Sequence, residues 1–188
     1  TGVQTCALPI CTRNFSTHTL NQPSAKDLGT SMITLNTAEQ RLAKFVGRER
    51  DRNGRRNGYT NLRIGPQSDE ETDLEGIAAE IAFARYTNVY PDLDIDCTEY
   101  PAHDAVLHDG TLVDVKTTTY PNGRLIVAPW KNVDAVDAYV LVVGKFPNYR
   151  IAGAMESYRL MRPHRMKDLG HGKVFVATQD ELKPLSEI

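Results

Sequence analysis

The sequence predicts an α/β or α+β fold built around one mixed β-sheet. Residues 71–86 place apolar side chains at the 3.6-residue period of a helix, with acids in the first turns where the helix dipole favours them. The segments that follow have the composition and length of strands and are separated by Gly-, Asn- and Pro-containing breaks. A helix followed by strands of different patterns indicates a mixed sheet with helical cover.

The strand patterns differ along the chain. The first two predicted strands are joined by a three-residue loop, 108–110, whose Gly stands where a hairpin needs a positive φ. The continuous apolar run over 138–143 indicates a strand covered on both faces. A helix or a loop is expected at 131–137 and a short helix at 156–161. The predicted strands are 98–107, 111–119, 124–128, 138–143, 149–155 and 173–177.

The N-terminal third divides into three parts. Residues 1–33 are predicted to be artefactual or disordered, because the first ten resemble the translation of a common sequencing adapter and the rest lack an apolar period. Met32 is a candidate start. Residues 34–70 are predicted to form a short helix over 34–46, capped by Asn36 or Thr37, and then a basic irregular arm with turn-forming Gly pairs. Residues 71–188 form the main domain.

Composition narrows the class of protein. A chain of 188 residues with 40% hydrophobic content can form one domain with a core. No apolar run is long enough for a membrane span, and no secretory signal is recognisable. Of three cysteines only Cys97 lies in the main domain, so neither an intramolecular disulfide nor a zinc site is expected there. These features predict a cytoplasmic protein that does not contact membranes.

Charge is distributed unevenly although the net charge is only −2. The stretch from Arg41 to Arg63 contains eight Lys or Arg and two acids, and an acidic run follows it directly. Such a stretch is either a phosphate-binding arm or a solvated linker, and the sequence leaves both open. Under the first interpretation Arg55, Arg56 and Arg63 contact nucleic acid.

A constellation of charged residues lies on the helix and the first two strands. Alternation along a strand places Asp114 and Lys116 on one face and directs Val115 into the core. The hairpin brings Asp104 toward Asp114 across the strand pair. We expect Glu80, on the preceding helix, to lie close to both.

Such a cluster predicts a divalent metal site. Neighbouring carboxylates repel unless a cation lies between them, and oxygen-only ligands select Mg²⁺, with Mn²⁺ as a substitute. The expected ligands are Asp104, Asp114, the main-chain carbonyl of Val115, and Glu80 for a second ion or a water. Lys116 would stabilise charge on a phosphodiester, and the hydroxyls of Thr117 and Thr118 would contact phosphate.

The arrangement resembles the PD-(D/E)xK nuclease superfamily over about residues 71–155. The matching residues are Glu80 in Gly76-Ile-Ala-Ala-Glu80, Asp104 in His103-Asp104, and Asp114-Val115-Lys116. The resemblance implies a restriction-endonuclease-like αβββαβ core, Glu80, Asp104, Asp114 and Lys116 as catalytic residues, Mg²⁺-dependent DNA hydrolysis and a possible homodimer. A small phage or prokaryotic enzyme is the nearest type, acting in the host cytoplasm if phage-encoded. The chain has His103 where the superfamily loosely keeps a Pro.

Alternative interpretations stay open at this point. The chain could be a non-catalytic DNA-binding or partner-binding domain of the same fold, or an unrelated α/β protein whose acids are scattered and structural. Asp109 competes with Asp104 as the first acid, although Asp is common in turns for backbone reasons. Trp130 could lie in the core or stack on a base, and the histidines and basic residues around 162–171 could contact DNA or be solvated.

Overall fold

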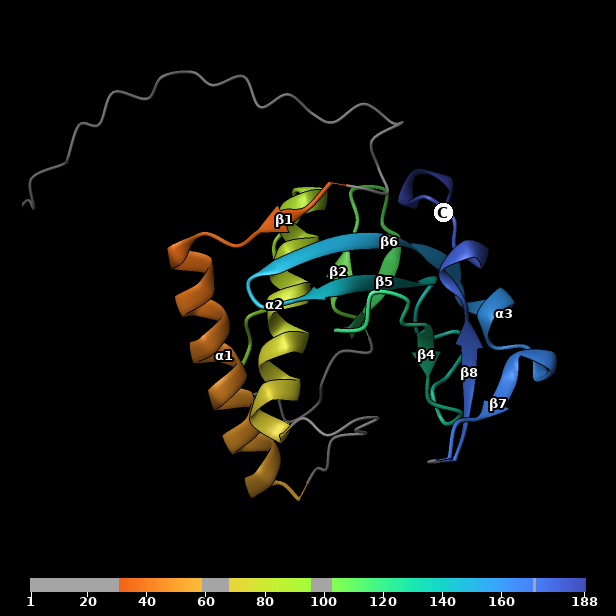
Figure 1. Ribbon diagram of the computed structural model, residues 1–188, viewed down its shortest axis with the longest axis horizontal. Helices are drawn as coiled ribbons and strands as arrows, with labels where there is room; N and C mark the ends of the chain where they lie inside the picture. Colours follow the sequence, from red (N-terminus) through yellow and green to blue (C-terminus); the bar gives the residue numbers. More distant parts are fainter. Residues whose placement is uncertain (1–30, 59–67, 96–102, 171) are drawn as a thin grey trace, which may run out of the picture.

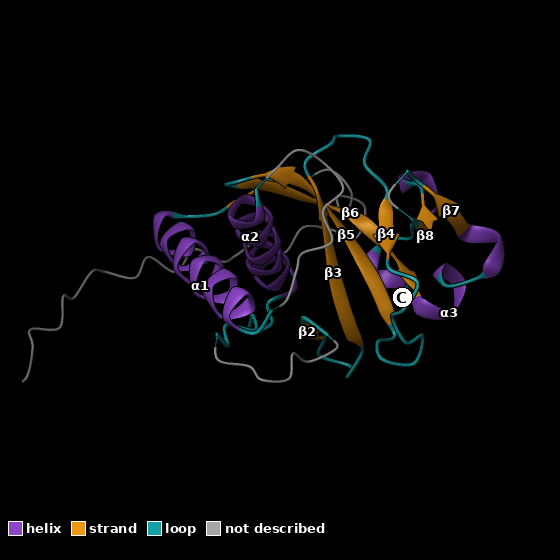
Figure 2. Cartoon of the chain, turned by 90° about the horizontal axis from the view of Figure 1, so that it is seen from below, coloured by secondary structure: helices purple, strands orange, loops and turns teal. Residues whose placement is uncertain are grey.

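The fold has three layers, and the first consists of two helices packed side by side. The computed structural model describes residues 31–58, 68–95, 103–170 and 172–188. In it, α2 (Asp69–Thr87) covers one face of a five-stranded sheet and α1 (Thr37–Arg56) packs on the outer side of α2, while a smaller sheet lies on the other side of the central sheet (Figures 1 and 2). The mixed α/β architecture predicted from the sequence is confirmed at this level.

Both long helices begin at capping boxes. Asn36 accepts from the backbone of residues 38 and 39, and Ser68 accepts from Glu71, while the N3 glutamate of each helix returns to the cap backbone. Each box satisfies amide groups that the first turn of a helix leaves without partners. The predicted Asn36 cap and the helix expected over 71–86 are therefore confirmed, with α2 two residues longer at its start and one at its end.

The prediction of an irregular chain after residue 46 is wrong for residues 47–56, which continue α1 as a helix. The Asn53-Gly54 pair that indicated a turn lies inside this helix. Tertiary packing outweighs the poor helix propensity of this pair, because Ala43, Val46 and Gly47 are buried against α2 and Asn53 donates to the carbonyl of Ile95. The expected arm at 59–67 lies outside the described residues.

The central sheet is mixed, in the order β1-β6-β5-β3-β2. β3 and β5 are parallel, whereas β1–β6, β5–β6 and β2–β3 are antiparallel. β5 is buried on both faces, as its continuous apolar run predicts. The strands are β1 (Ile33–Thr34), β2 (Ala105–Val106), β3 (Leu112–Thr118), β5 (Ala138–Lys145) and β6 (Asn148–Glu156).

The smaller sheet closes the other side of the central sheet. It has the order β4-β8-β7, all antiparallel, and packs beside the short helix α3. Its predicted strands at 124–128 and 173–177 are confirmed as β4 and β8, whereas β7 was not predicted. The elements are β4 (Leu125–Val127), α3 (Ser157–Leu160), β7 (Met166–Asp168), β8 (Lys173–Ala177) and the 3₁₀ turns η1 (Pro163–Arg165), η2 (Gln179–Glu181) and η3 (Leu185–Glu187).

Two segments differ from the expected αβββαβ order: the first strand is shorter than predicted, and turns stand in place of the second helix. Of the predicted strand 98–107, only Ala105–Val106 is a strand among the described residues, and 98–102 lie outside them. Between β4 and β5 the chain forms successive turns instead of a helix; in one of them the Asn132 side chain accepts from the backbone of Asp134 at 3.0 Å. The loop at 108–110 is a tight turn with Gly110 at φ +93°, as predicted.

The core consists of two apolar clusters on opposite faces of the central sheet. Val113, Val115 and Val140 point toward the helices and pack with α2 residues such as Phe83. Tyr139 and Leu141 point toward the smaller sheet and pack with Phe175 and Leu125 among others. The odd-numbered side chains of β3 therefore face the helices. Its even-numbered side chains, Asp114 and Lys116 among them, face the opposite side of the sheet.

Gly47 permits the close approach of α1 to α2. A Cβ at this position would lie 3.2 Å from Ile77 Cγ2 and 3.3 Å from the Leu74 Cα, and the latter is backbone that cannot swing aside. We predict that Gly47→Leu lowers the free energy of unfolding by about 2–3 kcal/mol, measured by urea denaturation. Gly54→Ala, in open space on the same helix, should instead raise it by about 0.5–1 kcal/mol. Equal effects of both variants would contradict this packing.

Candidate active site

Asp114 is the most deeply buried carboxylate of the predicted constellation. Its residue is 2% exposed, in the middle of β3. One carboxylate oxygen accepts from Lys116 Nζ, two residues along the same face of the strand, as the alternation predicts. The other accepts from Lys131 Nζ at 3.1 Å. Two ammonium groups thus neutralise a carboxylate that would be very costly to bury alone.

Asp104 is tied to β3 at two points. Its main-chain N–H donates to the carbonyl of Val113 at 2.8 Å, and its Oδ2 accepts from the N–H of Val115 at 2.6 Å. These bonds extend the β2–β3 pairing beyond the end of the short strand. The Asp104 side chain therefore lies at the edge of β3, beside the residue that separates Asp114 from Lys116.

Glu80 is contributed by α2 and is held by an arginine of α1. Arg50 NH1 lies 3.0 Å from Glu80 Oε2, and the Glu80 side chain is only 14% exposed, so Glu80 is not a solvated residue of the helix surface. The same guanidinium donates to the carbonyls of Asp92 and Asp94 at 3.0 and 3.1 Å. Arg50 thus joins α1, α2 and the segment after α2 around one charged group.

Electrostatic interactions connect the four predicted residues stepwise, from Glu80 to Asp104 and from Asp104 to Asp114, with Lys116 interacting with all three acids. Burial, and then the charge of Asp104, raise the pKa of Glu80 to about 8 in spite of Arg50. Burial, and then Asp114, raise the pKa of Asp104 to about 6. Burial lowers the pKa of Lys116, but the attraction of Asp114, Asp104 and Glu80 outweighs it and the net shift is upward. The pKa of Glu80 responds to Asp104, and the pKa of Asp104 responds to Asp114, so these acids lie close enough to interact and are not scattered.

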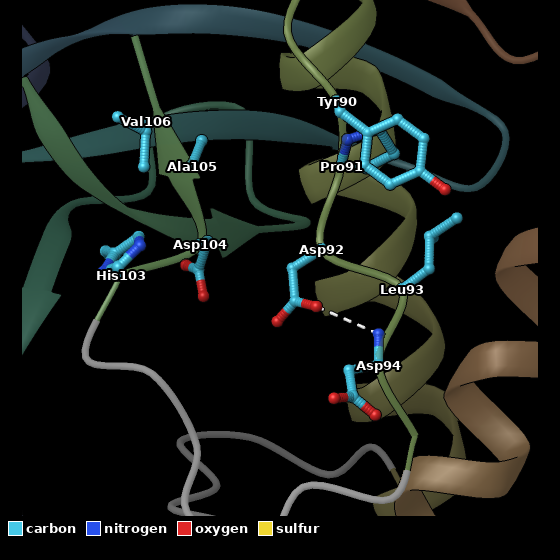
Figure 3. Close-up of a pocket in the computed structure, with 9 residues that line it drawn as sticks. All are labelled: Tyr90, Pro91, Asp92, Leu93, Asp94, His103, Asp104, Ala105 and Val106. Carbon is cyan, nitrogen blue, oxygen red and sulfur yellow. Dashed lines mark hydrogen bonds between the residues drawn. The ribbon is translucent and has the colours of Figure 1, made fainter. Parts of the chain in front are cut away.

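An open cleft gives access to Asp104. It has a volume of about 600 Å³ and lies between the segment after α2 and the start of β2 (Figure 3). Asp92 and Asp94 lie on one side of the cleft and His103 and Asp104 on the other. Tyr90, 81% exposed, stands at its upper end. The cleft is large enough to admit part of a polymer substrate beside Asp104.

Two residues of the site were not predicted. Lys131 belongs to the turns between β4 and β5, and Arg50 lies on the part of α1 that was expected to be irregular. No local pattern identifies either one, because their partners are 17 and 30 residues away in the chain. The only signal was the excess of basic residues around Arg50.

The structure also locates Asp109 and Trp130, for which the sequence left alternative roles open. Asp109 is exposed in the turn and its Oδ1 accepts from the N–H of Thr111 at 3.0 Å, so it has the backbone role that was weighed against a catalytic one. Trp130 is 71% exposed, and the expectation of a core position is wrong.

The residues predicted to contact nucleic acid do not form one group. Thr117 and Thr118 continue β3 beyond Lys116, with Thr117 Oγ1 buried and without a partner and Thr118 Oγ1 accepting from the N–H of Tyr120 at 3.3 Å. Arg55 pairs with Asp51, and Arg56 ends α1 and is exposed. Arg63 lies outside the described residues.

The predicted ligands do not surround a common point in this conformation. Within the described part of the chain, no three His, Cys, Asp or Glu side chains converge closely enough to hold a metal ion. Asp114 is turned to its two lysines and Glu80 to Arg50. The donor chemistry still fits a hard divalent ion, because the acids that influence one another offer only oxygen atoms.

Comparison with known proteins places the chain in a family but not in a functional class. The chain belongs to a family described as a family of unknown function (DUF5843), which matches residues 25–183. No curated protein matches the chain. None of the helices in the described ranges is both long enough and apolar enough to cross a membrane.

The raised pKa of Glu80 predicts a pH-dependent stability in metal-free solution. A pKa of about 8, against the ordinary 4.5, means that the folded chain holds a proton that the unfolded chain has lost between these values. Stability from this group is complete below about pH 4.5 and is lost as the pH rises toward 8. Relative to Glu80→Gln, the free energy of unfolding of the natural chain should therefore fall by about 1–3 kcal/mol from pH 5 to pH 8.

Urea denaturation in EDTA at several pH values measures this difference, and comparison with Glu80→Gln cancels the titration of other groups. Parallel pH profiles for the two proteins would contradict the assignment.

Proposed function

We propose that the protein is a divalent-metal-dependent nuclease that hydrolyses DNA phosphodiester bonds on a restriction-endonuclease-like core. The observation that carries the proposal is the set of interacting charges that Glu80, Asp104, Asp114 and Lys116 form beside an open cleft. Glu80 and Asp104 both have raised pKa values, and carboxylates with raised pKa values cluster at functional sites. Phosphodiester hydrolysis is the reaction that uses this set of groups.

Burial, and then repulsion by a neighbouring carboxylate, raise the pKa of Glu80 and of Asp104, and Mg²⁺, or Mn²⁺ in its place, would offset both effects. Asp104, Asp114 and the main-chain carbonyl of Val115 would hold it, with Glu80 holding a second ion or a water. The carbonyl is favoured because the N–H and C=O of one strand residue point to the same side, and the Val115 N–H already meets Asp104. When bound, the ion would polarise the phosphodiester and lower the pKa of a water.

The protein side chains supply the remaining chemistry. Lys116 carries a positive charge beside the acids and can donate to a phosphate oxygen as negative charge grows on it. Glu80, with a pKa of about 8, can exchange a proton with a water near neutral pH. Lys131 is 36% exposed on a turn, so it can leave Asp114 when a cation or a phosphate takes its place.

Parts of the fold support the resemblance and parts depart from it. The order α2, β2, β3, β5 supplies the helix with its Glu, the first acid and the Asp114-Val115-Lys116 strand in the expected sequence. β4 pairs with β8, and turns replace the second helix of the αβββαβ order. The proposed core is therefore a reduced version in which β5 follows directly on a loop.

We propose a phage or prokaryotic origin for this activity. A small enzyme of this type would act on DNA in phage or prokaryotic processing, repair or recombination, in the cytoplasm of the cell or host. A homodimer would allow two strands to be cut together.

One observation favours a second candidate, a non-catalytic DNA-binding or partner-binding domain of the same fold. Both oxygens of Asp114 are occupied by ammonium groups, and this pairing is satisfied without a metal. A chain that only binds would need this cluster for stability and not for chemistry. The two candidates differ in whether the intact protein cuts DNA.

Cleavage of labelled linear, circular and branched DNA separates the candidates. We predict cutting in Mg²⁺ or Mn²⁺ that stops in EDTA and falls at least 100-fold in Asp114→Asn and in Lys116→Ala, because each removes a group from the reacting centre. Lys173→Ala, at an exposed position of the smaller sheet, should cut like the natural chain. Metal-independent cutting, or no cutting of any of these DNAs, would contradict the nuclease and favour the binding domain.

A further inference from the structure

The outer face of α1 carries a row of exposed basic residues. At 100° per residue its six cations fall within an arc of about 120°, opposite the buried face formed by Ala43, Val46 and Gly47. No acid lies inside the arc, and Glu49 and Asp51 border it. The row, here called the α1 basic row, consists of Arg41, Lys44, Arg48, Arg52, Arg55 and Arg56, all of them exposed.

The row keeps a surplus of positive charge. Arg52 pairs with Glu49 at 2.6 Å and Arg55 pairs with Asp51, both at the border of the arc. Within the described residues, Arg41, Arg48 and Arg56 are in no ion pair with a carboxylate. A chain with a net charge of −2 thus concentrates unneutralised arginines on one side of one helix.

The position of α1 leaves the row open. Figures 1 and 2 show α1 as the outermost helix, with α2 between it and the central sheet. Its inner side carries Arg50, whose guanidinium reaches Glu80 at 3.0 Å. A helix with its side chains is about 10–12 Å thick, so the thickness of α1 separates the row from the Arg50 side that faces Glu80.

We infer that the α1 basic row binds the phosphate backbone of duplex DNA that flanks the scissile position. This inference rests on the proposed nuclease function and names the form of its substrate. Arg41 and Arg56 are about 22 Å apart along the helix, at 1.5 Å per residue, which corresponds to about six base-pair steps. Arginine forks match phosphate oxygens, and a duplex presents them on a rigid path.

The occupant is a duplex and not a single strand for a specific reason. Surfaces that bind single strands combine cations with several stacking rings. In helix α1, all of which lies within the described residues, the one aromatic ring is that of Phe45, which is 57% exposed. Binding through the row is therefore expected to depend on salt and to be insensitive to base sequence.

The test measures the binding of a DNA duplex by the full chain in EDTA, with fluorescence anisotropy as the readout, over a range of salt concentrations. The variant Arg41→Gln/Arg48→Gln/Arg52→Gln should bind at least tenfold more weakly at 100 mM salt. The slope of log affinity against log salt should fall by about 2–3, since each lost phosphate contact removes about 0.9. Gln keeps a helix propensity close to that of Arg.

A matched control removes the same charge elsewhere. Arg124→Gln/Lys145→Gln/Lys173→Gln changes three exposed positions outside α1 and should keep the natural salt slope. Equal slopes for the natural chain and the α1 variant, tighter binding of an RNA duplex than of the DNA duplex, or binding of anionic vesicles in place of DNA would each overturn the inference. Duplex binding through the row without any cleavage would support the DNA-binding role of the row and contradict the nuclease activity. Cleavage of DNA together with unchanged affinity in the α1 variant would support the nuclease activity and contradict the role of the row.

Discussion

Burial of the Asp114 carboxylate is the constraint on which the site depends. Val113 and Val115 must face the helices to complete the core, so the pleat of β3 turns Asp114 to the opposite face, where it is 2% exposed. A carboxylate in that position requires cations, and Lys116 and Lys131 provide them. The ion pairs then link β3 to the turns that follow β4, so one buried charge orders elements from both sheets.

A second group of contacts connects the site to the helical layer. Arg50 holds Glu80 and the carbonyls of Asp92 and Asp94, so α1 fixes both the position of an acid and one side of the cleft. The close approach at Gly47 keeps α1 near enough for this contact. The stability of the helix pair and the geometry of the site are therefore coupled, and a change in α1 packing is also a change at Glu80.

The elements that could be predicted are those whose pattern is local. The helix α2 has a 3.6-residue apolar period, and the strands β5 and β8 are short apolar runs with clear ends. The alternation around Val115 predicted correctly that Asp114 and Lys116 share a face of β3. The second half of α1 could not be predicted, because its Asn53-Gly54 pair favours a turn and only packing against α2 overrides it. The roles of Lys131 and Arg50 in the site could not be predicted either, because only the tertiary fold brings them close to Asp114 and Glu80.

If Glu80, Asp104 and Asp114 form a site for a divalent cation, the chain binds Mg²⁺ or Mn²⁺ in the absence of DNA. Calorimetric titration of Mg²⁺ and Mn²⁺ at pH 7, in buffers of different ionisation enthalpy, measures both binding and the protons that it displaces. We predict saturable binding with proton release, because a cation lowers the pKa of Glu80. Binding should weaken at least tenfold in Asp104→Asn. No binding of either ion, or equal binding by Asp104→Asn, would contradict the account and leave the cluster as a structural one.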